Sequence, residues 1–255
     1  MSEVGPLYVY GICRSGTRAP ASGLDGRSIR PVAVDGLAAL VSDAGPGPVE
    51  ATRDRLLTHA RVLEEIARHE TVLPMRFGVV APSEAALLEG VLAPRRRQLA
   101  KLLDRLEGLV EIDVRVFYEE EPVLREIVEK DPAIRRLRMR TQALPDDAGY
   151  YARVELGEAV AQAMRGLAAR DSKRIAGILG PLAVDVRRRE PTLEGMVAND
   201  AFLVRREYVD RFEREVRSLE AGGRVRTRTK GPLPPYSFVD ERIDPTERRG
   251  RRWAS

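Results

Sequence analysis

"IDVRVFY", residues Ile112–Tyr118, decides how the second half of the chain is interpreted. Apolar side chains recur at every second position of this stretch, with Asp113 and Arg115 between them. Because side chains alternate between the two faces of a β-strand, a period of two indicates a strand that is buried on one face. The neighbouring elements are assigned outward from this strand.

The rest of the second half alternates between the periods of helices and strands. Breaks at Pro122, Pro132 and Pro145 indicate a charged connector. Helices are predicted at 150–169 and 208–219, and strands at 182–186, 197–204 and 224–230. The inner stripe expected for the first helix is Tyr151, Val154, Val160, Met164 and Leu167. This β-α-β-β-α-β order predicts a ferredoxin-like domain over residues 111–239.

The first half predicts a second, separate α+β domain over residues 1–110. Strands are expected at 7–13, 29–34 and 37–42, the last two joined at the turn signal Asp35-Gly36. A helix is expected from Thr52, a strand at Val72–Val80, a short helix after Ser83 and a longer one at 94–106. The fold class predicted is therefore α+β with two domains. The charged residues 240–255 are expected to be a disordered tail.

Composition points to a soluble protein of the cytoplasm. The 255 residues are 43% hydrophobic and 32% charged, and no apolar stretch approaches the roughly 18 residues of a membrane span. The N-terminus lacks the pattern of a secretory signal. The net charge of +4 is concentrated near the end, where residues 224–252 hold nine Lys/Arg and four Asp/Glu. The high pI therefore describes the C-terminal segment rather than the whole fold.

The usual signatures of catalysis and of metal or nucleotide binding are missing from the sequence. It contains none of the phosphate-binding glycine motifs, no H-E-x-x-H and no G-x-S-x-G. His59 and His69 lie ten residues apart on one predicted helix, so they point about 80° apart and are expected on its surface. Cys13 ends an apolar strand and is expected to be a buried hydrophobic residue. We therefore expect no enzyme activity, no cofactor and no metal.

Arg76 interrupts the apolar run "VLPMRFGVV" at Val72–Val80. The side chain could bind an anion or act in catalysis, but other convergent polar groups would be needed, and none are apparent. The preceding helix offers Glu64, Glu65 and Glu70 as ion-pair partners. We expect Arg76 to be a structural residue at the polar face of the strand, held by a carboxylate or by backbone carbonyls.

A row of four cations gives the main alternative function, nucleic-acid binding. Arg224, Arg226, Arg228 and Lys230 share one face of the last predicted strand. An RNA-binding sheet of this topology also needs aromatic side chains to stack bases, and only Phe117 is available. Cations on an edge strand commonly protect that edge from pairing with another chain. Edge protection or a protein contact is therefore favoured over nucleic acid.

Several stretches together resemble the gas vesicle GvpL/GvpF family. They are "LYVYGI" (Leu7–Ile12), "VLPMRFGVV" after a helix that contains "THARVLEEI", "SEAALLEGVL", "VANDAFLV" leading into "YVDRFEREV", and "GPLPPYSFV" (Gly231–Val239). Their order and spacing cover nearly the whole chain. Arg76, Phe77 and Gly78 match the central motif of the family. Pro234, Pro235, Tyr236, Ser237 and Phe238 match its closing motif.

This resemblance implies a non-enzymatic protein of gas vesicles, the gas-filled buoyancy organelles of some prokaryotes. Such a protein is expected to be a minor vesicle constituent or an assembly factor. Its implied partners are the main shell protein and other accessory proteins, with no membrane partner. The motif residues are carried over as structural markers and not as a contact surface.

Overall fold

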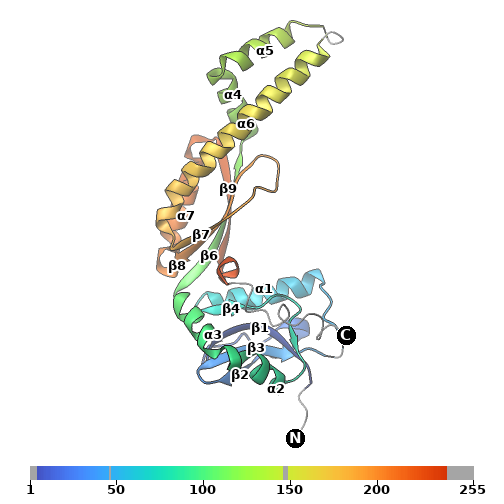
Figure 1. Cartoon of the computed structure of the whole chain (residues 1–255), viewed down its shortest axis with the longest axis vertical. Helices are drawn as coiled ribbons and strands as arrows, with labels where there is room; N and C mark the ends of the chain where they lie inside the picture. Colours follow the sequence, from blue (N-terminus) through green and yellow to red (C-terminus); the bar gives the residue numbers. More distant parts are fainter. Residues whose placement is uncertain (1–4, 46, 146–148, 240–255) are drawn as a thin grey trace. The chain divides into compact units, whose positions relative to one another are not determined.

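A computed structural model describes residues 5–45, 47–145 and 149–239, and it places them in two compact units (Figure 1). Among the described residues, the first unit comprises 5–45, 47–112, 203–206 and 231–239. The second comprises Asp113–Phe202 and Glu207–Lys230. The predicted domain limits at 110 and 239 stay predictions, and the tail at 240–255 lies outside the described residues.

The first unit contains a five-stranded sheet in which β1 is central. Its strands are β1 (Leu7–Arg14), β2 (Arg30–Val34), β3 (Leu37–Asp43), β4 (Val72–Pro74) and β5 (Val80–Ala81). β1 pairs antiparallel with β3 on one side, and with both β4 and β5 on the other. Asp35 and Gly36 have positive φ values of 47° and 84°, which is the backbone of the predicted β2–β3 hairpin turn.

Three helices complete this unit: α1 (Arg53–Ala67), α2 (Glu84–Leu87) and α3 (Ala93–Arg105). α1 begins where the sequence predicts, because the Thr52 side chain accepts a hydrogen bond from the amide of Arg55. Ser83 caps α2 in the same way, and a π-helical turn, η2 (Leu88–Leu92), joins α2 to α3. Val62, Leu63 and Ile66 of α1 are buried against Tyr8 and Tyr10 of β1. Cys13 is buried in the same core, as predicted, and burial raises the pKa of its thiol to about 11.

The predicted continuous strand at Val72–Val80 is wrong. Only its two ends pair with β1, as β4 and β5, and the residues between them form a turn. Pro74 has no amide hydrogen to continue a ladder, and Gly78 adopts a φ of +89°. An apolar run alone does not reveal such an interruption, because the buried side chains Met75 and Val79 still face the core.

The second sheet has four strands in the order β7-β8-β6-β9. They are β6 (Leu109–Tyr118), β7 (Asp185–Arg189), β8 (Met196–Arg205) and β9 (Val225–Leu233). The basic strand therefore lies at a sheet edge, as predicted. The two sheets confirm the α+β class. The ferredoxin-like assignment itself stays a prediction.

Four helices belong to the second unit: α4 (Glu120–Lys130), α5 (Pro132–Gln142), α6 (Tyr150–Leu179) and α7 (Val209–Ser218). The predicted connector is thus wrong, because α4 and α5 are helices. Pro132 lies in the first turn of α5, where proline fits, and Asp131 accepts hydrogen bonds from the amides of Ala133 and Ile134. α6 is also ten residues longer than predicted. Phe212 of α7 contacts Phe202 of β8, with ring centroids 5.1 Å apart.

Part of the inner stripe predicted for α6 is wrong as well. Tyr151 is 84% exposed and Val154 is also exposed, whereas the buried Ala152 lies on the opposite side of the helix. α6 carries apolar or small residues around much of its surface, so its sequence period does not select the packed face. In the described part of the chain, no helix combines the length and the hydropathy needed to cross a membrane.

Candidate functional site

Aromatic rings gather beneath the central motif in the first unit. The Tyr8 ring centroid lies 4.9 Å from that of Tyr10, 5.7 Å from His59 and 5.9 Å from Phe77, each with an edge-to-face geometry. Such pairs stabilise a core beyond the area that they bury. Phe77 of the central motif therefore has a packing role.

The surface position predicted for His59 is wrong, because its side chain is only 6% exposed. Nε2 lies 3.1 Å from the carbonyl oxygen of Met75, so it carries the proton and donates. Nδ1 lies 2.8 Å from the hydroxyl of Tyr8, which donates to it. Burial lowers the pKa of His59, although the bond to Met75 opposes this. The neutral ring has both nitrogens occupied and offers no lone pair to a metal.

The central-motif residues Arg76, Phe77 and Gly78 form the turn between β4 and β5. The Gly78 amide donates to the hydroxyl of Tyr8 at 3.3 Å, so the backbone of the motif is tied to β1. The Arg76 side chain is exposed. If Arg76 has a structural role, as we expect, it therefore acts from the protein surface and not through a buried ion pair.

The closing motif lies in the same unit and is fixed by a buried carboxylate. The Ser237 amide and hydroxyl donate to the two oxygens of Glu111, each at 2.7 Å, and Glu111 is buried. Arg105 donates to the carbonyl oxygen of Phe238 at 3.0 Å. Burial raises the pKa of Tyr236, and the charges of Glu64 and Glu111 add to the rise. Both motifs therefore lie in one unit, and Tyr236 keeps a partly exposed ring at its surface.

The basic row of the second unit already has partners within that unit. Arg224 donates to Glu126 of α4 and, at 2.6 Å, to Asp171 of α6. Arg226 pairs with Glu119, and the guanidinium groups of Arg226 and Arg228 lie 4.9 Å and 5.3 Å from the centroid of the Phe117 ring. These contacts use charge and aromatic surface that nucleic-acid binding would require. Lys230 also has an interaction partner.

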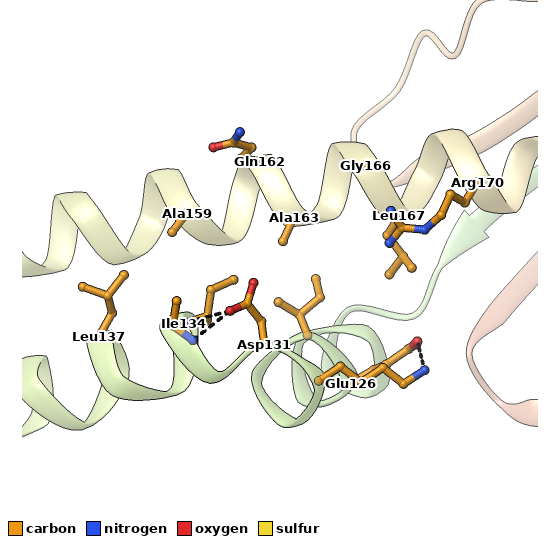
Figure 2. Close-up of a pocket in the computed structure, with 13 residues that line it drawn as sticks. Glu126, Asp131, Ile134, Leu137, Ala159, Gln162, Ala163, Gly166, Leu167 and Arg170 are labelled. Atoms are coloured by element: carbon orange, nitrogen blue, oxygen red, sulfur yellow. Dashed lines mark hydrogen bonds and ion pairs between the residues drawn. The ribbon is translucent and has the colours of Figure 1, made fainter.

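A groove of about 520 Å³ separates α6 from the α4–α5 pair (Figure 2). Eight of its thirteen lining residues are apolar or glycine. α6 contributes Ala159, Ala163, Gly166 and Leu167, and α5 contributes Ile134 and Leu137. Volumes of this size are typical of ligand sites. The groove is therefore a candidate binding site.

Exposed apolar side chains are also concentrated in sequence at the end of α5 and the start of α6. Five of the eleven exposed large apolar side chains among the described residues lie between positions 139 and 154. They are Met139, Leu144, Tyr150, Tyr151 and Val154. The rings of Tyr150 and Tyr151 contact each other edge-on at 5.5 Å. Sequence reasoning missed this surface by placing two of the five in the buried stripe; the adjacent pair Tyr150-Tyr151 at a helix start was the available signal.

The described residues contain no group of three or more His, Cys, Asp or Glu side chains placed to hold a metal ion. The features found are closed cores, paired charges, a groove and exposed apolar side chains. The chain is an α+β protein with two sheets, and its candidate sites are surfaces for binding.

Comparison with known families identifies the chain further. It belongs to the gas vesicle synthesis protein GvpL/GvpF family, whose model matches residues 6–240. Gas vesicle protein F of Streptomyces sp. (strain CB03234) is 36% identical over 239 residues, which cover 91% of this chain and 99% of the relative. Gas vesicle protein F of Nostoc sp. (strain PCC 7120 / SAG 25.82 / UTEX 2576) is 28% identical over 241 residues, which cover 91% of this chain and 97% of the relative.

Two solved structures share the fold. The crystal structure of the gas vesicle protein GvpF from Anabaena sp. PCC7120 matches with a TM-score of 0.77 and 26% identity, over 92% of this chain and 98% of that one. The crystal structure of the gas vesicle protein GvpF from Microcystis aeruginosa matches with a TM-score of 0.70 and 25% identity, over 92% of this chain and 99% of that one. The chain is therefore a gas vesicle protein, as its motifs predict.

Proposed function

We propose that this protein binds the main shell subunit of the gas vesicle and acts, with other accessory proteins, during assembly of the vesicle wall in the cytoplasm. A shell that keeps liquid water out of a gas space needs very apolar subunits. Before incorporation such subunits would aggregate through exposed apolar surface. A protein that holds or positions these subunits would prevent their aggregation. The protein acts either as a minor constituent of the vesicle or only while the wall is built.

The observation that carries the proposal is the cluster of exposed apolar side chains at positions 139–154. Tyr150 and Tyr151 are 63% and 84% exposed, and Met139 is 66% exposed. Leaving such groups in water is unfavourable, so a concentration of them is typical of protein interaction sites. Tyrosine and methionine are also among the residue types enriched at interfaces. The proposed role is binding, with no catalysis, cofactor or metal.

Nucleic-acid binding by Arg224–Lys230 is the alternative, and the pairing of Arg224 and Arg226 with carboxylates disfavours it. The salt dependence of binding distinguishes the two functions. Phosphate binding should weaken steeply between about 50 and 200 mM salt, whereas mainly apolar contact should change little.

The test is co-purification of the shell subunit with a tagged form of this protein, performed at both salt concentrations beside a nucleic-acid shift assay. We expect the shell subunit in the eluate at both concentrations and no shifted nucleic acid. A salt-sensitive shift without the shell subunit would replace the proposed function by the alternative. Absence of the shell subunit at both concentrations, together with normal vesicles after deletion of the gene, would end the proposal.

A further inference from the structure

We propose that the groove between α6 and the α4–α5 pair holds an apolar segment of the shell subunit, with a carboxylate of that segment facing Arg170. This inference rests on the proposed function and adds the position and chemistry of the contact. Three properties of the groove lead to it: its space, its lining and its charge.

The space exists because α6 presents small side chains toward α5. Ala159, Ala163 and Gly166 line the groove from α6, and Figure 2 shows Ala159 and Ala163 pointing into the gap. From Ala159 to Arg170 the groove follows α6 for about 16 Å, at about 1.5 Å per residue. This length matches about three turns of a helix or five residues of a strand. A segment of a partner can therefore lie along the groove.

The lining favours an apolar occupant. Ile134 and Leu137 of α5 project toward α6 across the gap (Figure 2), as does Leu167 from the other side. Leu137 and Leu167 are only partly buried, so an apolar occupant would remove further surface from water. A larger hollow of about 840 Å³ on the same helices is a weaker candidate for such an occupant, because seven of its eleven lining residues are polar or charged.

The groove is lined by two carboxylates, Glu126 and Asp131, and by two cations, Lys130 and Arg170, and three of these four groups have partners. Glu126 is paired with Lys130 and Arg224, and Asp131 accepts two backbone amides. Arg170 also lines the groove, and within the described part of the chain it has no hydrogen bond or ion pair. A guanidinium beside an apolar surface favours a carboxylate partner, because the ion pair is stronger where water is excluded. The occupant is therefore an apolar segment that carries an acidic residue.

The first experiment fills the groove. Ala163→Phe places a ring in the gap, and Ala161→Phe places the same ring about 160° away around α6, on a face that does not line the groove. Each variant is co-expressed with the shell subunit, and the amount of shell subunit recovered per tagged chain is measured. We expect Ala163→Phe to lower this ratio at least tenfold and Ala161→Phe to leave it within twofold of wild type.

The second experiment reverses the charge, so that the proposal does not depend on the folding of the Phe variant. Arg170→Glu is compared with Arg165→Glu, whose side chain is exposed and does not line the groove. We expect Arg170→Glu to lower the recovered ratio at least fivefold and the control to leave it unchanged. Melting temperatures of all four variants are measured in parallel to show that they are folded.

The outcomes separate this inference from the function on which it rests. If wild type recovers no shell subunit, the proposed function fails and the groove proposal falls with it. If wild type recovers the subunit and folded Ala163→Phe and Arg170→Glu do so equally well, the groove inference is wrong and the proposed function stands. Loss of self-association by the groove variants, with shell recovery unchanged, would assign the groove to a second copy of this chain and overturn the inference.

Discussion

His59 shows how packing determines the chemistry of a side chain that the sequence leaves ambiguous. It is a titratable residue on an amphipathic helix, and its spacing from His69 suits a surface position. In the fold it lies against Tyr8, Tyr10 and Phe77, and hydrogen bonds to Tyr8 and Met75 occupy both ring nitrogens. The sequence could not predict this, because the partners come from β1 and from the turn after β4.

The lowered pKa of His59 predicts a pH-dependent stability. As the pH falls through 6.5, the unfolded chain gains a proton at this histidine that the folded chain does not. The free energy of unfolding should therefore decrease between about pH 7 and pH 5, and His59→Gln should reduce this slope. His69→Gln, which changes an exposed histidine, is the matched control variant. Urea denaturation at several pH values in this range measures the slope of the free energy of unfolding against pH. Equal slopes in wild type and His59→Gln would contradict the lowered pKa of the buried His59.

Arg76 lies on the turn of the central motif, and its exposure limits its contribution to stability. Exposed ion pairs are worth about 0–1 kcal/mol. Arg76→Ala should therefore lower the free energy of unfolding by less than about 1 kcal/mol, with recovery of the shell subunit unchanged. Thermal melting and co-purification are measured on the same preparation. An unchanged melting temperature with lost recovery would show that Arg76 is a contact residue.

The helices of the second unit depend on a small ion-pair network. Arg224 precedes β9 and links Glu126 of α4 with Asp171 of α6, while the Tyr118 hydroxyl also donates to Asp171 at 2.5 Å. Burial raises the pKa of Asp171, but the hydrogen bonds from Arg224 and Tyr118 outweigh it and hold the pKa below its usual value. The network therefore fixes two helices relative to the sheet edge.

Removing the centre of this network should destabilise the second unit. Arg224→Met should lower the free energy of unfolding by about 1–3 kcal/mol, because two partly buried carboxylates lose their partner. Arg228→Met, which removes an exposed cation–π contact with Phe117, should cost less than about 1 kcal/mol. Chemical denaturation compares the two. Equal, small losses would mean that the network contributes little.

Some elements can be predicted from the sequence and others cannot, for physical reasons. Strands such as β1, β3, β6 and β8 carry clear apolar patterns, and the Asp35-Gly36 turn requires positive φ values that Asp and Gly tolerate. α4 and α5 were missed because Pro122 and Pro132 suggest breaks, although proline in the first turn of a helix is favourable. The groove and the exposed face of α6 depend on which side of a helix with apolar or small residues around much of its surface is packed, and no local pattern specifies that.

The family motifs and the proposed binding surfaces lie in different units of the chain. The central and closing motifs lie in the first unit, whereas the groove and the exposed side chains at 139–154 belong to the second. Membership in the family could be predicted because the motifs are contiguous stretches of sequence that can be recognised without the fold. The surface for the shell subunit could not, because it consists of ordinary side chains left uncovered by tertiary packing.

The proposed role predicts that this protein keeps an apolar shell subunit in solution. Tyr150→Ser combined with Tyr151→Ser should weaken this effect several-fold, because it removes two exposed aromatic anchors. The matched control is Tyr208→Ser, which changes an exposed tyrosine outside the 139–154 cluster. Both variants should keep the wild-type melting temperature.

The most direct measurement is the fraction of shell subunit that stays in the supernatant after centrifugation, with increasing amounts of this protein added. We expect the soluble fraction to rise in proportion to wild-type protein and to Tyr208→Ser, and much less with the Tyr150/Tyr151 double variant. A soluble fraction that does not change when folded wild-type protein is added would show that this protein does not keep the shell subunit in solution.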